Sequence, residues 1–196
     1  MKECYVAGEV FNHIIAATKD AANKNCAREP LNHIRIEVYN DIHKIKAVAC
    51  DGYIMAVEYG EIDKRNGCDE NFVFYVNPDL PKMPKNKGGL HISLEATGDG
   101  KTIARVECAN QRVDIVQPQG EYIKYEPIIA AVKPAMRVGV DIKHMIKLLK
   151  GMQAGFGGEQ AVLEIQGSQF AILMRPYKNS ESVRLIMPVR ISNSDN

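Results

Sequence analysis

The chain has 196 residues with a formal net charge of +1, and 45% of the residues are hydrophobic. This length suffices for one large domain or two small ones with a buried core. The near-zero charge provides no overall field for nucleic acid, so any basic surface has to be local. The first residues form no hydrophobic signal segment, and no apolar run approaches the length of a membrane span. We therefore expect a cytoplasmic protein.

No pattern in the chain indicates a catalytic or metal site. The five cysteines are scattered without a C-x-x-C pair, which is typical of free thiols in a reducing compartment. The five histidines lack metal-ligand spacing. The glycine-rich stretch 151–158 lacks the Lys-Ser/Thr of a phosphate loop, and no base stands at a recognisable spacing from Cys50. We expect no metal, no cofactor and no catalytic residue, and hence a protein that is not an enzyme.

The hydrophobic pattern uses one unit three times, a short strand followed by a helix and three strands. In the first unit, apolar residues at helical spacing predict a helix over 8–24. Alternating residues then predict three strands, separated by turns at Asn40-Asp41 and Asp51-Gly52. These strands are expected around 34–38, 45–49 and 53–59. The charged residues 61–70 are predicted to form a surface loop.

The second unit begins with a predicted strand at 71–77. Three prolines between 78 and 84 then stand in the place of the helix, and each of them removes a backbone donor and restricts the residue before it. We therefore expect no more than about one helical turn there. The strands that complete this unit are predicted near 89–96, 102–108 and 112–118.

The third unit has a predicted strand at 136–140 and a predicted helix at 141–150. Asp141 is the expected N-cap and Gly151 the expected C-cap, and 151–158 is expected to be a flexible connection. Four residues at i, i+3, i+4 and i+7 predict the apolar helix face; they are Ile142, Met145, Ile146 and Leu149. Further strands are predicted near 160–166, 169–175 and 183–191. Antiparallel strands with one helix per unit predict an α+β fold of sheets backed by helices.

Three segments, taken in this order, resemble the bacterial DNA polymerase III beta subunit, the replicative sliding clamp. They are Arg28-Glu29-Pro30-Leu31-Asn32, Ala49-Cys50-Asp51-Gly52-Tyr53-Ile54-Met55-Ala56 and Met187-Pro188-Val189-Arg190. The family patterns are R-x-x-L-N, A-T-D-G-x-R-L-A and M-P-x-R. Residues 120–125 resemble the family's exit segment G-x-F/Y-P-D-Y. Among the departures of the chain from these patterns are Cys50, Ile54 and Ile123, where the family has Thr, Arg and Pro.

The resemblance implies a DNA-clamp-like fold with one and a half clamp domains. Residues 1–130 resemble the whole middle domain, and residues 131–196 resemble the second half of the last domain. The implied function is that of a processivity or accessory factor, which binds duplex DNA without sequence specificity. It would recruit DNA polymerase or other clamp-binding proteins through short hydrophobic peptides. The alternative is a clamp-derived protein-interaction module that no longer encircles DNA.

The family motifs imply a peptide groove with an apolar floor and a polar rim. Leucine and methionine give an adaptable floor, tyrosine gives flat contact area, and arginine can bind carbonyl groups at the rim. The ten implied residues are Arg28, Leu31, Cys50, Gly52, Tyr53, Met55, Leu185, Met187, Pro188 and Arg190. The alternative is that Met55, Leu185 and Met187 are core residues of alternating strands.

Clamp helices line the hole of the ring, so the resemblance also implies lysines that face DNA. These are Lys19, Lys24, Lys143, Lys147 and Lys150. Lysines there would contact phosphates without reading sequence. The alternative is an ordinary solvated helix face. The helix predicted at 141–150 carries no acidic residue after its cap, which favours DNA.

The number of units predicts an assembly. Residues 1–130 use two units and leave the third alone, with an exposed sheet edge and an exposed apolar face. Pairing two such units across a two-fold axis would cover both, so we expect a homodimer or a higher even-numbered homo-oligomer. Four chains would contain twelve units, as in a complete bacterial ring. The alternative is a monomer in which the third unit packs on the first domain.

Overall fold

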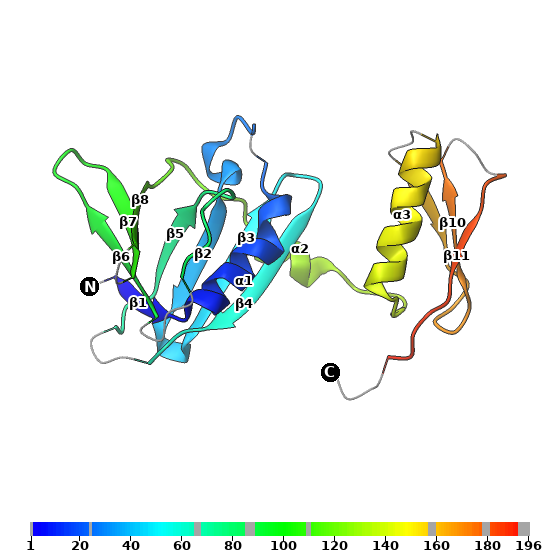
Figure 1. The fold of residues 1–196 in the computed structure, drawn as a ribbon, viewed down its shortest axis with the longest axis horizontal. Helices are drawn as coiled ribbons and strands as arrows, with labels where there is room; N and C mark the ends of the chain where they lie inside the picture. The colour runs from blue at the N-terminus through cyan, green and yellow to red at the C-terminus, as the bar shows by residue number, and fades with distance from the viewer. Residues whose placement is uncertain are drawn as a thin grey trace. The chain divides into compact units, whose positions relative to one another are not determined.

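The computed structural model describes residues 2–23, 25–64, 68–84, 89–108, 111–156, 160–177 and 181–191. The chain divides into two compact units, unit 1 (Met1–Lys124) and unit 2 (Tyr125–Asn196) (Figure 1). Each unit combines antiparallel sheets with helices, as the sequence predicts. No helix in the described residues is both long enough and apolar enough to cross a membrane.

Unit 1 contains two halves of similar element order. The elements of the first half are β1 (Glu3–Val6), α1 (Gly8–Thr18), β2 (Ile34–Tyr39), β3 (Lys44–Cys50) and β4 (Met55–Glu61). Those of the second half are β5 (Phe72–Val76), β6 (Leu90–Ala96), β7 (Thr102–Cys108) and β8 (Gln111–Val116). The proline-rich residues 78–84 form no helix, as predicted.

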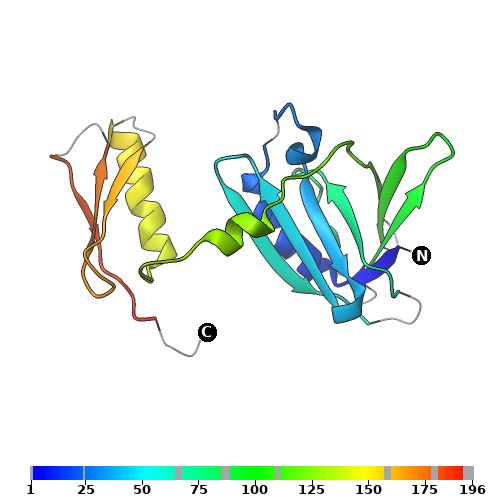
Figure 2. The same cartoon turned by 180° about the vertical axis from the view of Figure 1, so that it is seen from behind.

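The two halves of unit 1 exchange their first strands. One sheet has the order β1-β6-β7-β8 and the other β4-β3-β2-β5 (Figure 2). Strand β1 of the first half therefore pairs with β6 of the second half, and β5 of the second half pairs with β2 of the first, both antiparallel. Each half completes the sheet of the other, which makes the two halves one folding unit.

The core of unit 1 lies where the inner faces of both sheets meet α1. Its largest fully buried side chains include Phe11, Ile14 and Phe74. The helix ends at Thr18, before the predicted end at residue 24, because the chain tightens into a 3-10 turn at Lys19–Ala21 and is extended at Ala22. The Thr18 hydroxyl donates a hydrogen bond to the carbonyl oxygen of Ile14 over 2.8 Å, a bond that competes with regular helix geometry.

The proline-rich segment takes over part of the role of the absent second helix. The side-chain amide of Asn12 on α1 donates to the Met83 carbonyl over 2.7 Å and accepts from the Met83 N–H over 2.8 Å. Met83 is only 2% exposed. The segment therefore covers one flank of α1, and the backbone N–H and C=O of the buried Met83 remain satisfied.

Unit 2 contains one half of this pattern, preceded by a short helix. Its elements are α2 (Glu126–Ala131), α3 (Ile142–Phe156), β9 (Ala161–Glu164), β10 (Ile172–Pro176) and β11 (Arg184–Ile186). The sheet has the order β11-β10-β9, and α3 packs on one of its faces (Figure 1). The buried members of this small core are Met152, Ile172, Met174 and Ile186.

Several predictions for unit 2 are wrong in detail. The predicted strand at 136–140 forms only an isolated bridge between Gly139 and Val189. The helix α3 continues through the predicted C-cap Gly151 to Phe156, because the added turn buries Met152 against the sheet. The predicted connection at 151–158 is therefore largely helical, and its residues 157–158 lie outside the described part. Strand 183–191 is reduced to β11, and α2 was not predicted.

Of the predicted apolar face of α3, only Met145 packs on the sheet. The residues that pack on the sheet are Met145, Leu148 and Met152. Ile142, Ile146 and Leu149 lie on an adjacent flank and are 72%, 45% and 42% exposed. A helix packed on a single sheet buries only one stripe of side chains. Within the described part of unit 2, this second apolar stripe is left in solvent.

Candidate partner-binding and DNA-facing surfaces

The turn between β3 and β4 is fixed by the carboxylate of Asp51. This carboxylate accepts hydrogen bonds from the N–H groups of Tyr53 (2.7 Å) and Ile54 (2.8 Å), and both bonds lower the pKa of Asp51. Gly52 has a φ of 95°, a conformation that favours glycine. The turn holds the Tyr53 side chain 97% exposed and Ile54 53% exposed. Such exposure leaves the tyrosine ring free for a partner.

Three other predicted groove residues of unit 1 offer little surface. Cys50 and Leu31 are buried, and Met55 is half-buried. The Cys50 sulfur accepts the N–H of Gly52 over 3.4 Å. Arg28 is exposed. In unit 1, therefore, Arg28 and Tyr53 are the predicted groove residues best placed to touch a ligand.

Tyr122 anchors the segment 119–124 on the outer side of the sheet that contains β3. Its side chain is buried, and its hydroxyl donates to the carbonyl oxygen of Val48 over 3.3 Å. The Arg35 guanidinium lies 5.6 Å from the centre of its ring, and the Tyr75 ring lies 6.0 Å away. Burial, together with the neighbouring Cys50 and Tyr75, raises the pKa of Tyr122 above that of a free phenol.

An open pocket of about 710 Å³ lies between residues 27–30 and residues 119–124. The carboxylate of Glu29 accepts the N–H of Gln119 over 3.2 Å, which joins the two segments. The sequence singled out both segments through family motifs but gave no signal that they adjoin. Their contact places Arg28 at the pocket that Tyr122 supports.

The predicted groove residues of unit 2 lie on the outer side of β11 and the residues after it. Leu185 is 51% exposed and Met187 is 62% exposed, whereas Ile186 between them is buried toward α3. Arg190 is exposed and Pro188 half-buried. The alternative that Leu185 and Met187 are core residues is therefore wrong, because this strand turns Ile186 to the core.

The outer face of this sheet extends the apolar surface beyond the predicted residues. The strand register pairs Leu173 with Leu185 and Arg175 with Val162, so Val162 and Leu173 share the face of Leu185. Val162 is 41% exposed, and Leu173 is half-buried. Sequence reasoning missed both residues, although alternation within the predicted strands 160–166 and 169–175 could have indicated them.

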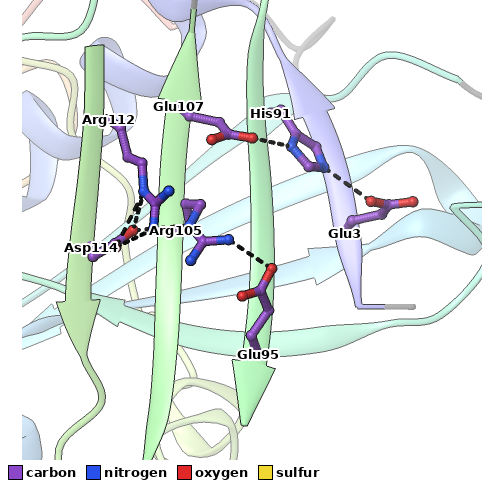
Figure 3. A network of polar contacts seen from close by, with 7 residues as sticks. All are labelled: Glu3, His91, Glu95, Arg105, Glu107, Arg112 and Asp114. Atoms are coloured by element: carbon purple, nitrogen blue, oxygen red, sulfur yellow. Dashed lines mark hydrogen bonds and ion pairs between the residues drawn. The ribbon is translucent and has the colours of Figure 1, made fainter. Parts of the chain in front are cut away.

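The outer face of the sheet β1-β6-β7-β8 in unit 1 has the opposite character (Figure 3). The ring nitrogens of His91 lie 3.0 Å from carboxylate oxygens of Glu3 and Glu107. Arg105 bonds Glu95 over 2.9 Å and Asp114 over 3.1 Å, and Arg112 also bonds Asp114. This mixed, internally paired surface suits neither an apolar peptide nor a polyanion.

The predicted DNA-facing lysines differ between the two long helices. On α3, Lys143, Lys147 and Lys150 are exposed on one face, and the helix contains no acidic residue. Lys19 is exposed in the 3-10 turn that follows α1, but Asp20 beside it and Glu9 in the first turn of α1 are exposed as well. Lys24 lies outside the described residues. The described lysines therefore form a basic face only on α3.

The predicted N-cap of α3 is confirmed. A carboxylate oxygen of Asp141 accepts the N–H of His144 over 2.9 Å. This bond, above all, lowers the pKa of Asp141. A carboxylate at this position also complements the helix dipole. The start of the basic face is thereby fixed.

Within the described residues, no group of three or more histidine, cysteine or acidic side chains could hold a metal ion. The five cysteines are free thiols. Burial, followed by the neighbouring Cys68 and Glu3, raises the pKa of the Cys4 thiol. A raised thiol pKa disfavours the reactive thiolate.

No protein-family model and no curated protein matches the chain. Solved structures of bacterial clamps do match it. The DNA polymerase III subunit beta from Pseudomonas aeruginosa is 14% identical with a TM-score of 0.61, over 97% of this chain and 67% of that chain. The DNA polymerase III beta chain from Streptococcus pneumoniae is 12% identical with a TM-score of 0.75, over 97% and 50%.

A third match is the Helicobacter pylori beta clamp bound to a DNA ligase peptide. It is 10% identical with a TM-score of 0.69, over 95% of this chain and 49% of that chain. At such identities the likeness is one of fold. The chain has the fold of bacterial DNA polymerase III beta sliding clamps, which confirms the predicted α+β, DNA-clamp-like class. It spans about half to two thirds of the length of these clamps.

Proposed function

We propose that this protein is a non-catalytic, sliding-clamp-like accessory factor of DNA replication or repair. It recruits partner proteins by binding short hydrophobic peptides and holds duplex DNA without reading its sequence. Six of the ten predicted groove residues belong to unit 1 and four to unit 2. The protein acts in the cytoplasm as an even-numbered homo-oligomer.

The observation that carries the proposal is the exposure of apolar groove residues on ordered elements. Tyr53 is 97% exposed on a turn held by three backbone hydrogen bonds of Asp51. Met187 is 62% exposed directly after β11. Exposed tyrosine and methionine on a fixed frame are typical of interface anchors. The peptide-bound Helicobacter pylori clamp, which shares the fold, supports this choice of ligand.

Alanine substitutions test the peptide groove. Tyr53→Ala or Met187→Ala should weaken binding of a Q-L-x-L-F-type peptide by roughly 1–3 kcal/mol, as expected when an interface anchor is removed. Fluorescence polarisation with a labelled peptide measures the affinity. Both side chains are exposed, so the free energy of unfolding should change by less than about 0.5 kcal/mol.

Matched controls separate an anchor from a general surface effect. Tyr59→Ala in unit 1 and Phe170→Ala in unit 2 remove aromatic side chains that are 60% and 56% exposed and lie outside the predicted groove. Both control variants should bind the peptide with the same affinity as the unchanged protein. Equal losses of affinity in the controls and in the groove variants would contradict the assignment of the groove.

The basic face of α3 supports the second part of the proposal, contact with DNA. The logarithm of the DNA-binding constant should fall linearly with the logarithm of the salt concentration. Replacing Lys143, Lys147 and Lys150 by alanine should make this slope less steep by about 0.9 for each phosphate that the helix no longer neutralises. A control with the same change in charge replaces three exposed lysines of unit 1, namely Lys44, Lys82 and Lys101. An unchanged salt dependence in the α3 variant would refute phosphate binding by this helix.

A clamp-derived interaction module that no longer encircles DNA is the second candidate. The mixed charge of α1 and of the 3-10 turn after it, where Lys19 is accompanied by exposed Glu9 and Asp20, favours it. Retention on nicked circular DNA compared with linear DNA separates the two candidates. Retention on the circle alone supports a clamp, whereas intact peptide binding without retention on the circle identifies the module.

A further inference from the structure

The described residues contain the half-domain pattern, a first strand, a helix position and three strands, three times, and each copy closes at a corresponding place. In each copy the first strand is joined to a residue one to three positions after its own last strand. Tyr5 of β1 bridges Asp63 after β4, and Gly139 bridges Val189 after β11. In the second copy the backbone of Tyr75 on β5 bonds the side-chain amide of Gln117 after β8, over 2.7 and 3.2 Å.

The other edge of the first strand is used differently. In unit 1 this other edge pairs with a strand of the other half, namely the strand that follows that half's helix or, in the second half, the proline-rich segment in its place. Tyr5 lies opposite His91, the second residue of β6, and Tyr75 lies opposite Arg35, the second residue of β2. In unit 2 no strand of the described residues pairs with the other edge of 138–140, and β9 forms the open edge of the described sheet.

Gly139 is the counterpart of Tyr5. Tyr5 stands three residues before the first residue of α1, Gly8, and Gly139 stands three residues before the first residue of α3, Ile142. Val138 and Val140, on either side of Gly139, pack half-buried against the core of unit 2. The segment 138–140 therefore has the position of a first strand, but no sheet of another half-domain lies on its other edge among the described residues.

We propose that unit 2 is completed by a second copy of itself, and that the two copies exchange the segment 138–140 across a two-fold axis. Each segment adds to the open edge of β9 in the other copy. The register seen twice in unit 1 places Gly139 of one copy opposite Val162, the second residue of β9, in the second copy. Val138 then lies opposite the second copy's Leu163, and Val140 opposite its Ala161.

Burial at the equivalent positions supports this register. Ile92 lies opposite Cys4 in unit 1, Ile36 lies opposite Phe74, and all four are fully buried. Leu163 holds the same place in β9 but is 51% exposed. This position is buried where β6 pairs with β1 and where β2 pairs with β5, but it is exposed in β9. The exposure indicates that a strand is missing beside β9. The aliphatic Val138 has the chemistry to cover Leu163.

The backbone of β9 presents matching hydrogen-bond groups. The N–H of Tyr177 donates to the carbonyl oxygen of Gln160 over 3.0 Å, so Gln160 bonds toward β10. Because hydrogen-bonded pairs alternate along antiparallel strands, Ala161 and Leu163 direct their N–H and C=O groups to the open edge. An open edge of this kind is a template for another strand.

The exposed flank of α3 faces the same way as the open edge. A pocket of about 340 Å³ lies between them, lined by Ile146 and Leu149 on the helix and by Ala161 on β9. In unit 1 the flank of α1 is covered at Asn12 by Met83, from the helix position of the other half. Ile146 occupies the place in α3 that Asn12 has in α1. The second copy's α3 would cover this apolar flank.

This pairing requires neither DNA nor peptide, so the full chain alone tests it. Light scattering across micromolar concentrations should give the mass of two chains or an even multiple. Leu163→Lys should raise the dissociation constant about tenfold or more, because it removes a buried leucine and places a charge in the interface. Phe170→Lys, at a side chain of similar exposure in the same unit, should change it less than about threefold.

Hydrogen exchange tests the register without a substitution. The amides of Ala161 and Leu163 should become protected as the protein concentration rises, while the amide of Val162, which bonds toward β10, is protected throughout. A single-chain mass at every concentration would overturn the proposal. So would equal effects of Leu163→Lys and Phe170→Lys, or an assembled form in which Ala161 and Leu163 exchange freely.

Discussion

Tyr122 fastens the segment that leaves unit 1 to the sheet beside the candidate pocket. The side chain is 6% exposed, and its hydroxyl donates a 3.3 Å hydrogen bond to the Val48 carbonyl. Tyr122→Phe should destabilise unit 1 by about 1 kcal/mol, because it removes one neutral hydrogen bond and keeps the ring. Tyr122→Ala should cost about 3–5 kcal/mol, because it also empties the space of a buried aromatic ring.

The same residue predicts a dependence of stability on pH. Burial raises the pKa of the folded Tyr122 phenol above the unfolded value of about 10. A raised pKa means that the fold favours the neutral phenol. Its contribution to stability is therefore fully present below about pH 10 and is lost as the pH rises through the folded value. Tyr122→Phe should remove this part of the alkaline loss of stability.

Urea denaturation followed by circular dichroism measures both effects, and hydrogen exchange of β2 and β3 assigns them to unit 1. Tyr59→Ala is the matched control, because this tyrosine is 60% exposed, and its cost should stay within about 0.5 kcal/mol. If Tyr122→Ala costs no more than Tyr59→Ala, Tyr122 is not an anchor. If Tyr122→Phe leaves the alkaline transition unchanged, the titrating group is another residue.

Two further outcomes are expected. Glu37 and Lys46 are 3% and 6% exposed, and their charged atoms lie 2.6 Å apart. Glu37→Ala should lower the free energy of unfolding by about 3–5 kcal/mol in urea denaturation, because the lysine would stay buried without this carboxylate. A loss of stability below about 1 kcal/mol would contradict this prediction. Asp141→Ala should speed hydrogen exchange in the first turn of α3. The fold lowers the pKa of Asp141. The carboxylate therefore stabilises the helix above its unfolded pKa of about 3.9, and this stabilisation is lost as the pH falls through the folded pKa. Hydrogen exchange in the variant should lack this acid dependence.

Local sequence signals predicted the elements whose cause is local. The start of α1, the strands of unit 1 and the Asp141 cap follow from side-chain periodicity and from hydrogen bonds within one turn. The absence of a helix at 78–84 follows from the missing donors of proline. The order of the family motifs also predicted the clamp fold, which the structural matches confirm. Each of these signals lies within a short stretch of chain.

Tertiary structure decided what depends on residues far apart in the sequence. Periodicity marked α3 as amphipathic, but only the sheet that covers it determines that Met145 is packed and Ile146 is left exposed. The meeting of residues 27–30 with 119–124 and the burial of Tyr122 depend on packing across unit 1. The strand exchange between its halves likewise depends on pairing between distant strands. Hydrophobic contact and strand pairing stabilise whichever surfaces the fold brings together, and the pattern of a single segment does not specify its partner.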